Sequence, residues 1–189
     1  MEMRSVVRRR RLIALGALAV VSSWAASAVH ARDLAPEEFQ ALSPMCQAML
    51  GDKGSRKERM REFSQLLPGT CGVHHTCYGE LAMIRYKRAA LKKPLSSDNY
   101  KQAVYKRNLR FLLQTAAQEY SYEIRCAPPT YPLLPMIHTE RGKALSLAGK
   151  HAEAVKDFSR ALELDPNYAP ARQALALAQS RVITPKSSK

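Results

Sequence analysis

The sequence predicts an all-α fold, because the 3.6-residue period of an amphipathic helix recurs along most of the chain. Alternation of apolar and polar residues, which half-buried strands need, is almost absent. Proline and glycine separate the periodic stretches and leave room for helices of ordinary length. The 189 residues suffice for one domain of ordinary size. Their composition, 46% hydrophobic and 24% charged, excludes collagen-like, wholly disordered and multi-span membrane proteins.

Residues 1–31 have the pattern of a secretory signal peptide. A basic run from Arg8 to Arg11 precedes an uncharged segment from Leu12 to Trp24, and small residues follow it. We expect cleavage after Ala28 or Ala31. A retained membrane anchor is the alternative, although the apolar segment is shorter than the roughly 20 residues of a spanning helix. The sequence therefore predicts an exported protein located in a bacterial periplasm.

Residues 32–130 are expected to hold four helical stretches. Pro36 belongs to a first helical turn, the Pro68-Gly69 pair ends a helix, and Ser96 to Asp98 offer N-caps. Pro44 should kink or split the first stretch. The stretches cover residues 36–50, 56–67, 74–91 and 99–126.

Residues 131–183 are expected to form three further helices, followed by a tail at 184–189. Two helices of about 14 residues are separated by a break at Gly149 and Lys150. The turn Asp165-Pro166-Asn167 then leads to a third helix at about 170–182. All three carry the periodicity of helices with one apolar face.

The spacing of small and large residues in this part resembles the tetratricopeptide repeat, a 34-residue helix-turn-helix unit. With Pro166 as the terminator, the repeat runs from Pro135 to Tyr168. The resemblance implies a close helix crossing at Gly142 and a stack of about three units, because one repeat cannot bury its own apolar face. The matching positions are Gly142, Leu145, Gly149, Ala154, Phe158, Ala161 and Pro166.

Two residues of the repeat depart from the family pattern. His138 and Arg141 stand where the family usually has larger apolar residues, so we expect the first helix to pack less tightly on the unit before it. The last helix should act as a cap, because Gln173, Gln179 and Arg181 suit an outer, polar face.

The same spacing recurs in a weaker form within residues 32–130, which must supply the rest of the stack. Tyr78-Gly79 followed by Ala82 imitates the first helix of a repeat, and Ala116 with Tyr120 imitates the second. The predicted architecture is a short solenoid of stacked antiparallel helix pairs. Its N-terminal half is irregular and stapled by disulfides.

An even number of cysteines in an exported protein indicates disulfides. Their count alone allows three pairings, so topology must choose. An antiparallel hairpin of the two longest helices brings Cys71 near Cys126, which leaves Cys46 for Cys77. Each bond should stabilise the fold by about 2 to 4 kcal/mol.

The segment from Cys71 to Cys77 also allows a different chemistry. His74, His75 and Cys77 could ligate a metal ion or serve a redox reaction, because imidazole and thiolate are common metal ligands. Their spacing fits no established metal motif, and an oxidising compartment favours disulfides. The stretch also resembles a group of small exported bacterial proteins with a lone repeat, which implies a location and no mechanism.

Positive charge is concentrated in residues 85–110, where nine basic residues stand against Asp98 alone. Such a run is either a solvated face or a site for an anionic partner, which could be a membrane surface, an acidic polysaccharide or an acidic protein. We do not expect nucleic acid to be the partner, because an exported protein rarely meets it.

The sequence predicts an adaptor that binds another protein, and no enzyme or cofactor. Paired carboxylates, a nucleophile elbow and a phosphate-binding loop are all missing from the sequence. A periplasmic metal-binding or redox accessory protein, using His74, His75 and Cys77, is the alternative. The expected partner-binding residues are Thr139, Lys143 and Ser146 on the repeat, and Lys92, Lys93, Arg107 and Arg110 on the basic hairpin.

Overall fold

The computed structural model describes residues 34–51, 56–68 and 72–183, and all regular structure in these ranges is helical. The predicted signal peptide and the tail lie outside the described residues. None of the helices in these ranges is long and apolar enough to cross a membrane.

The three N-terminal helices are short. They are α1 (Pro36–Ala41), α2 (Pro44–Leu50) and α3 (Arg56–Leu66). The predicted split at Pro44 is confirmed, because α1 ends before Leu42 and Pro44 starts α2. The side chain of Ser43 caps α2 by accepting a hydrogen bond from the backbone N–H of Cys46.

A long antiparallel hairpin follows, made of α4 (Val73–Leu91) and α5 (Asn99–Cys126). Asp98 is the N-cap of α5, since its carboxylate accepts hydrogen bonds from the backbone N–H groups of Tyr100 and Lys101 at 2.8 and 3.3 Å. The connection between the two helices covers residues 92–98.

The C-terminal part contains α6 (Leu134–Leu147), α7 (His151–Leu164) and α8 (Ala169–Ile183). Gly149 makes the turn between α6 and α7 with a φ of +83°, a left-handed conformation that glycine adopts without strain. The predicted break at Gly149 is therefore confirmed.

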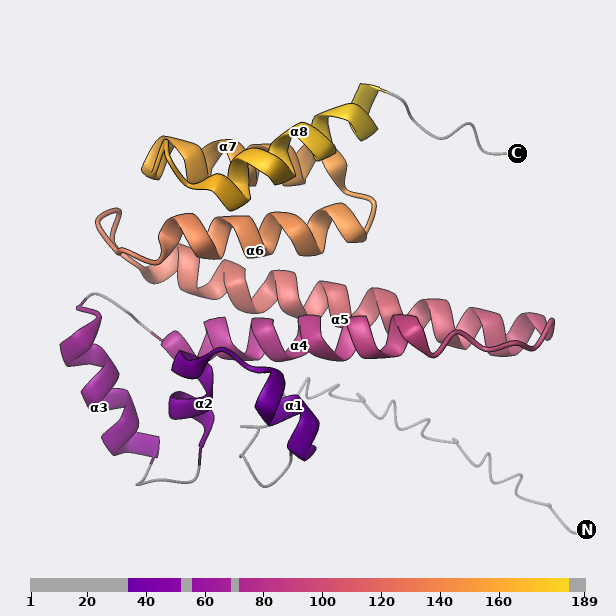
Figure 1. Ribbon diagram of the computed structural model, residues 1–189, viewed down its shortest axis with the longest axis horizontal. Helices are drawn as coiled ribbons and strands as arrows, with labels where there is room; N and C mark the ends of the chain where they lie inside the picture. Colours follow the sequence, from indigo (N-terminus) through magenta and orange to yellow (C-terminus); the bar gives the residue numbers. More distant parts are fainter. Residues whose placement is uncertain (1–33, 52–55, 69–71, 184–189) are drawn as a thin grey trace, which may run out of the picture.

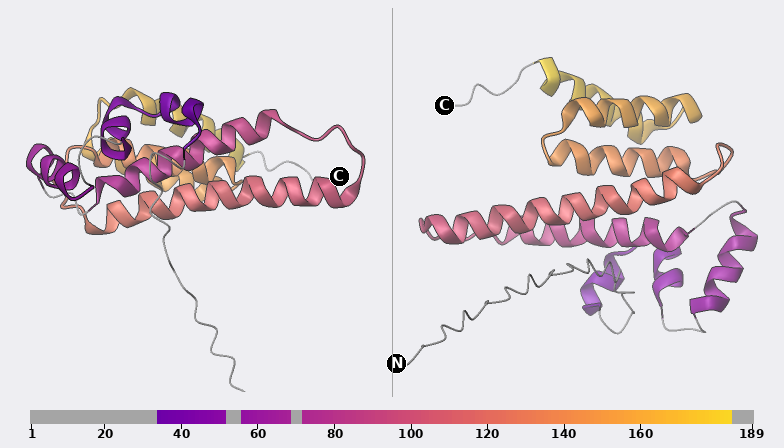
Figure 2. Two further views of the ribbon diagram at one scale, coloured as in Figure 1. Left: turned by 90° about the horizontal axis from the view of Figure 1, so that it is seen from below. Right: turned by 180° about the vertical axis from the view of Figure 1, so that it is seen from behind.

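The helices lie side by side in chain order from α4 to α8 (Figures 1 and 2). α1 and α2 pack on the free side of α4, and α3 packs on α2. α6 also contacts α4 on one side and α8 on the other. The first helix of each pair and the last helix therefore form a row, as in a repeat solenoid. The fold is the predicted short stack of helix pairs.

Three apolar clusters hold this stack together. One joins α1 and α2 to α4, the second joins α4, α5 and α6, and the third joins α7 and α8. Their largest fully buried side chains include Met49, Tyr120, Tyr131, Ile137 and Phe158. Because each cluster spans neighbouring elements, no helix pair buries its apolar face alone.

Two glycines set the close crossings within the hairpins. An added Cβ at Gly142 would lie 2.6 Å from the Phe158 ring, and one at Gly79 would lie 2.7 Å from the Tyr120 ring. The prediction that helices cross closely at Gly142 is confirmed, and α4 and α5 cross at Gly79 in the same manner.

The disulfide between Cys46 and Cys77 joins α2 to α4, with 5.2 Å between their Cα atoms. This predicted pair is confirmed. Cys126 is also disulfide-bonded, and its predicted partner Cys71 lies outside the described residues. The N-terminal half is therefore stapled, as the cysteine count predicted.

Candidate functional site

The structure shows that the α4–α5 and α6–α7 hairpins are two versions of one unit. When the two sequences are aligned on the crossing glycine and its aromatic partner, further residues of the same kind fall at equivalent positions. The equivalent pairs are His75 and His138, Thr76 and Thr139, Gly79 and Gly142, Glu119 and Asp157, Tyr120 and Phe158, and Pro128 and Pro166.

Each unit contains a histidine-carboxylate contact that links its first helix to its second. His75 Nδ1 lies 2.7 Å from Glu119 Oε2 in the first unit, and His138 Nδ1 lies 3.0 Å from Asp157 Oδ1 in the second. The second contact is more buried, with side-chain exposures of 9% and 4% against 19% and 25%. The two contacts therefore differ in how strongly water screens them.

Asp157 is the centre of a small buried network. Arg141 donates hydrogen bonds to both Asp157 carboxylate oxygens and another to the hydroxyl of Ser121 on α5, at 3.2 Å. Burial opposes ionisation of Asp157, but the hydrogen bonds from His138 and Arg141 outweigh it and hold the pKa of this carboxyl below its usual value. The network ties α5, α6 and α7 together.

This network corrects the expectation for His138 and Arg141. We expected these polar residues to loosen the contact between the repeat and the unit before it. Instead, they are the partners of Asp157, and Arg141 reaches back to α5. The polar groups replace apolar packing with charge-assisted hydrogen bonds, so the repeat stays closely packed on α5.

The predicted partner-binding residues of the repeat lie on α6 in different settings. Thr139 is fully buried, and its hydroxyl donates to the carbonyl oxygen of Pro135 at 2.8 Å, so it offers no open surface in this structure. Lys143 is partly exposed and pairs with Glu140 at 2.6 Å. The hydroxyl of Ser146 lies 3.4 Å from His151 Nδ1.

Two leucines that the sequence analysis did not select lie on the same row of helices. Leu147 on α6 is 47% exposed, and Leu177 on α8 is 56% exposed. Together with Lys143 they give α6 and α8 exposed apolar and charged groups. We call Lys143, Leu147 and Leu177 the repeat face.

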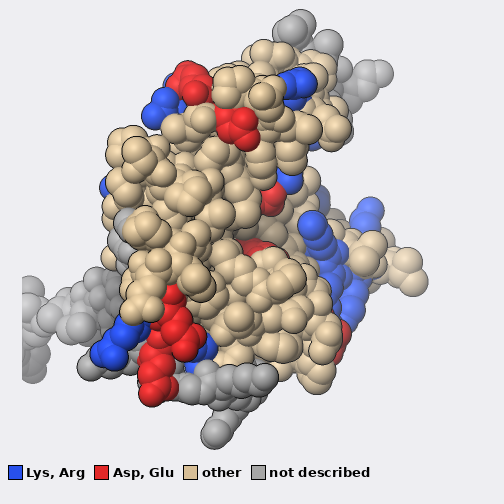
Figure 3. Space-filling view, turned by 60° about the vertical axis from the view of Figure 1, so that its left-hand side comes forward, with Lys and Arg blue, Asp and Glu red and all other residues tan. Residues whose placement is uncertain are grey.

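The second candidate surface is the end of the long hairpin, residues 85–110, which we call the hairpin tip. The tip projects beyond the rest of the stack (Figures 1 and 2), and Lys and Arg side chains gather on the projecting part (Figure 3). The four tip residues selected from the sequence, Lys92, Lys93, Arg107 and Arg110, are all exposed.

Two basic residues of the tip are already neutralised. Arg85 binds Glu38 of α1 at 3.0 Å, and Arg88 pairs with Glu37 and Glu38. The hydrogen bond from Arg85 lowers the pKa of Glu38, which keeps this carboxyl ionised. The other seven basic residues of the tip are exposed and pair with no carboxylate of the described residues. They are Lys87, Lys92, Lys93, Lys101, Lys106, Arg107 and Arg110.

The alternative metal or redox site at His74, His75 and Cys77 has no free sulfur ligand in the structure. Cys77 is bonded to Cys46 and is fully buried, so it is not a thiolate. The ring of His75 contacts Glu119 and stacks on Tyr122 with 3.9 Å between the ring centres. The described residues contain no cluster of three metal-binding side chains.

Comparison with known families supports the interpretation of the second hairpin. Residues 135–168 match the family model of the tetratricopeptide repeat, the same residues that the spacing marks. The chain contains a tetratricopeptide repeat. No curated protein matches the chain. Tetratricopeptide repeats generally mediate contacts between proteins and are not typically enzymes.

Sequence reasoning missed the carboxylates of both units, although a signal was present. An acidic residue directly precedes the crossing aromatic in each second helix, as Glu119-Tyr120 and Asp157-Phe158, and a histidine lies four residues before each crossing glycine. An alignment of the two hairpins on those glycines and aromatics would have paired the residues.

Proposed function

We propose that this protein is an exported, non-enzymatic adaptor of the bacterial cell envelope that binds a protein partner through its repeat face. The observation that carries the proposal is the tetratricopeptide repeat at residues 135–168, which lies between the α4–α5 unit and α8 in one continuous stack. A repeat in such a stack presents its first helices as an extended binding surface.

The exposed groups of the repeat face fit this role. Leu147 and Leu177 offer apolar area that stays in water in the unbound protein, and the partly exposed Lys143–Glu140 pair offers charged groups on the same helix as Leu147. Interfaces combine such apolar anchors with a few charged contacts. Export is supported by the pattern of residues 1–31, and an anionic envelope component at the hairpin tip is the second partner that we propose.

Site-directed photocrosslinking in the native envelope tests the protein partner. A crosslinking amino acid at Leu177 or Leu147 should capture the same protein, whereas the same amino acid at Leu66 on α3, which is 74% exposed, should not capture it. Capture from all three positions, or from none, would contradict the proposal.

A substitution in the repeat face measures the contribution of its charge. Lys143→Ala should weaken binding of the captured protein by about 1 kcal/mol, mostly through faster dissociation, if Lys143 becomes desolvated in the complex. Lys156→Ala on the exposed side of α7 is the matched control and should leave dissociation unchanged. Equal effects of the two substitutions would show that the repeat face is not the interface.

A further inference from the structure

The hairpin tip carries large apolar side chains as well as cations. Leu91, Leu95 and Tyr100 are 87%, 105% and 77% exposed, and all three lie in or beside the connection of residues 92–98. Single exposed apolar residues are common on proteins, but three within ten residues of a projecting hairpin concentrate apolar area there. We call these three residues the patch.

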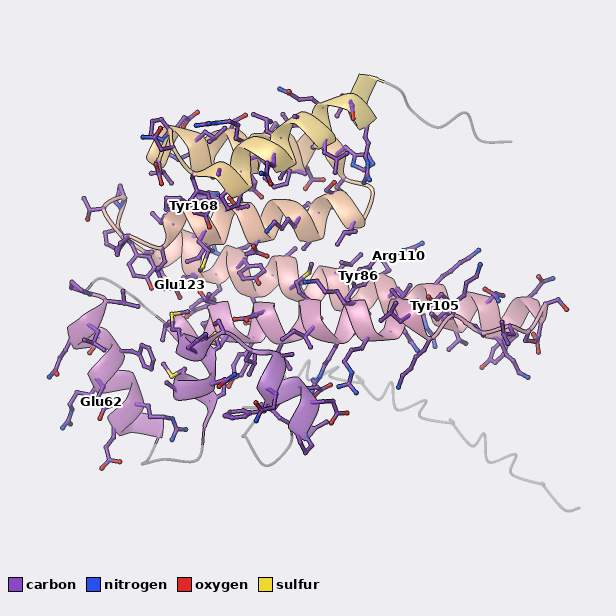
Figure 4. All side chains as sticks on the ribbon, viewed as in Figure 1. Glu62, Tyr86, Tyr105, Arg110, Glu123 and Tyr168 are labelled. Atoms are coloured by element: carbon purple, nitrogen blue, oxygen red, sulfur yellow. A yellow bond between two sulfur atoms is a disulfide. The ribbon has the colours of Figure 1, made fainter. Side chains whose placement is uncertain are left out.

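Basic residues lie between and on both sides of these three apolar residues in the sequence. Leu91, Leu95 and Tyr100 lie in or beside the connection, and the cations lie in the connection, in the last turns of α4 and in the first turns of α5. Of the hairpin residues labelled in Figure 4, Tyr105 lies toward the free end, while Tyr86 and Arg110 lie farther back. The basic residues on both sides of the patch are Lys87, Lys92, Lys93, Lys101, Lys106 and Arg107.

The tip keeps this arrangement because its own backbone is well held. Tyr105 donates a hydrogen bond to the carbonyl oxygen of Ala90 at 3.0 Å, which ties α5 to the end of α4. The side-chain amide of Gln102 donates to the carbonyl oxygens of Pro94 and Ser96 at 3.1 and 2.9 Å. The connection is therefore fixed by partly buried polar contacts, while the side chains of Leu91 and Leu95 are exposed to solvent.

An open groove lies at the same place. It has a volume of about 420 Å³ and is lined by Lys92, Pro94, Tyr100, Lys101, Val104, Tyr105 and Asn108. Its lining is mainly apolar, and its two lysines supply positive charge. This combination suits an anionic group that is attached to an apolar chain.

We propose that the hairpin tip is a docking device for an anionic lipid bilayer, with Leu91, Leu95 and Tyr100 inserted at the headgroup level and the lysines bound to lipid phosphates. The proposal rests on the second part of the proposed function, in that it identifies the anionic envelope component. It does not involve the repeat face. A failure of the tip experiment would therefore leave the adaptor proposal intact, and the converse also holds.

The observations favour a bilayer over the other two anionic partners. An acidic polysaccharide would pair with the lysines but would leave the leucines in water. An acidic protein could cover both kinds of group, but it would need a concave surface that matches the convex end of the hairpin. A bilayer accepts a convex tip and satisfies both kinds of group.

Vesicle binding by the full chain tests the proposal. The full chain should bind vesicles of equimolar phosphatidylglycerol and phosphatidylcholine more tightly than vesicles of phosphatidylcholine alone, and high salt should weaken this preference. Hydrogen exchange of residues 91–100 should slow when the charged vesicles are added. Because residues 1–31 are the same in every variant, differences between variants report on the tip.

Two pairs of substitutions separate the apolar contribution from the charged one. Leu91→Ser with Leu95→Ser should lower the partition coefficient about tenfold or more, since two leucines lose their apolar contact. Lys92→Gln with Lys93→Gln should lower it by about tenfold, which corresponds to a few-fold for each lysine near the surface. The matched controls are Leu66→Ser for the leucines and Lys150→Gln with Lys156→Gln for the lysines, all exposed residues away from the tip.

The outcomes are distinct. Larger losses from the tip pairs than from the controls, with an unchanged helical circular dichroism spectrum, support the proposal. Equal losses from tip and control pairs would overturn it. Absent vesicle binding, together with binding to soluble dextran sulfate that needs the lysines and not the leucines, would also overturn it and would indicate a polysaccharide partner.

Discussion

The α4–α5 and α6–α7 hairpins share the residues at which their helices cross but differ at the ends that join them. Forty residues separate Gly79 from Tyr120, whereas 15 separate Gly142 from Phe158, so the first hairpin is longer by 25 residues. The added length projects beyond the stack as the hairpin tip (Figure 1). A unit can therefore be extended at its turn without loss of the crossing that defines it.

The two hairpins also differ in how they are held in the stack. The first is joined to α2 by the Cys46–Cys77 disulfide, and Glu80 of α4 accepts hydrogen bonds from the backbone N–H and hydroxyl of Ser43 at 2.6 and 2.8 Å. The second is held to α5 by the Asp157 network. It follows that the N-terminal unit depends on a covalent bond and the C-terminal unit on buried charge.

A further contrast concerns the second helices. Glu123 of α5 is fully buried at the position that Ala161 occupies in α7, and it lies toward the end of α5 opposite the tip (Figure 4). The unit that departs from the family pattern in length thus also departs from it in its interior. Both departures distinguish the first hairpin from residues 135–168, which match the family model.

Removal of the Cys46–Cys77 disulfide should produce the largest difference in stability between the two hairpins. Cys46→Ala with Cys77→Ala opens a loop of 31 residues, and the chain-entropy argument gives a loss of about 4 kcal/mol in the free energy of unfolding. Hydrogen exchange should show the loss in α1, α2 and α4 and much less in α7 and α8. An even loss of protection over all helices would mean that the two units do not differ in this way.

Neutralisation of the two equivalent carboxylates should have the next largest effect, and the loss of stability should differ between the two hairpins. Asp157→Asn should lower the free energy of unfolding by about 3 kcal/mol, because the guanidinium of Arg141 then has no opposite charge beside it in this buried network. Glu119→Gln should cost about 1 kcal/mol, since water screens the contact with His75. Urea denaturation of both variants at pH 7 measures the difference, and similar losses would contradict it.

The acid stability of the protein should depend on Asp157. The pKa of Asp157 is lowered in the folded protein, so its ionised form stabilises the fold at pH values above the ordinary pKa of 3.8. This contribution is lost as the pH falls through the lower pKa of the folded state. The stability gap between wild type and Asp157→Asn should therefore stay constant from pH 7 to about 5 and close below about pH 4. Thermal unfolding across this range measures the gap. A gap that persists to the lowest pH would show that Asp157 acts through its shape and not its charge.

The crossing glycines should respond alike in both hairpins. Gly142→Ala and Gly79→Ala each force a Cβ against an aromatic ring, and each should cost about 2 kcal/mol through overpacking. Gly149→Ala is the control, because its Cβ would meet no atom within 4 Å and its cost, about 1 kcal/mol, comes from the positive φ alone. Denaturation curves that show a neutral Gly79→Ala would break the equivalence of the two units.

Charge reversal at the tip should have the smallest effect on stability. Lys92, Lys93, Arg107 and Arg110 are exposed, so their replacement by Glu should change the free energy of unfolding by less than about 0.5 kcal/mol. Urea denaturation measures the change. A large loss would show that the tip is part of the core of its unit and not an extension free to serve another purpose.

The sequence by itself determined the elements that depend on local interactions. The split at Pro44, an N-cap among Ser96 to Asp98 and the turn at Gly149 follow from residues within one or two helical turns. The frame from Pro135 to Tyr168 follows from the residue spacing along a single repeat. The Cys46–Cys77 pair also followed, because an antiparallel hairpin left one pairing that fits.

Only the tertiary structure decided which polar groups meet across helices. The contacts of Ser43 with Glu80, Glu38 with Arg85 and His75 with Glu119 join residues 37 to 47 positions apart. Periodicity indicates which face of a helix is apolar, but the partner of a polar side chain depends on the rotation and offset of two packed helices. For the same reason, the burial of Thr139 and the exposure of Leu91 and Leu95 became visible only when the helices were in place.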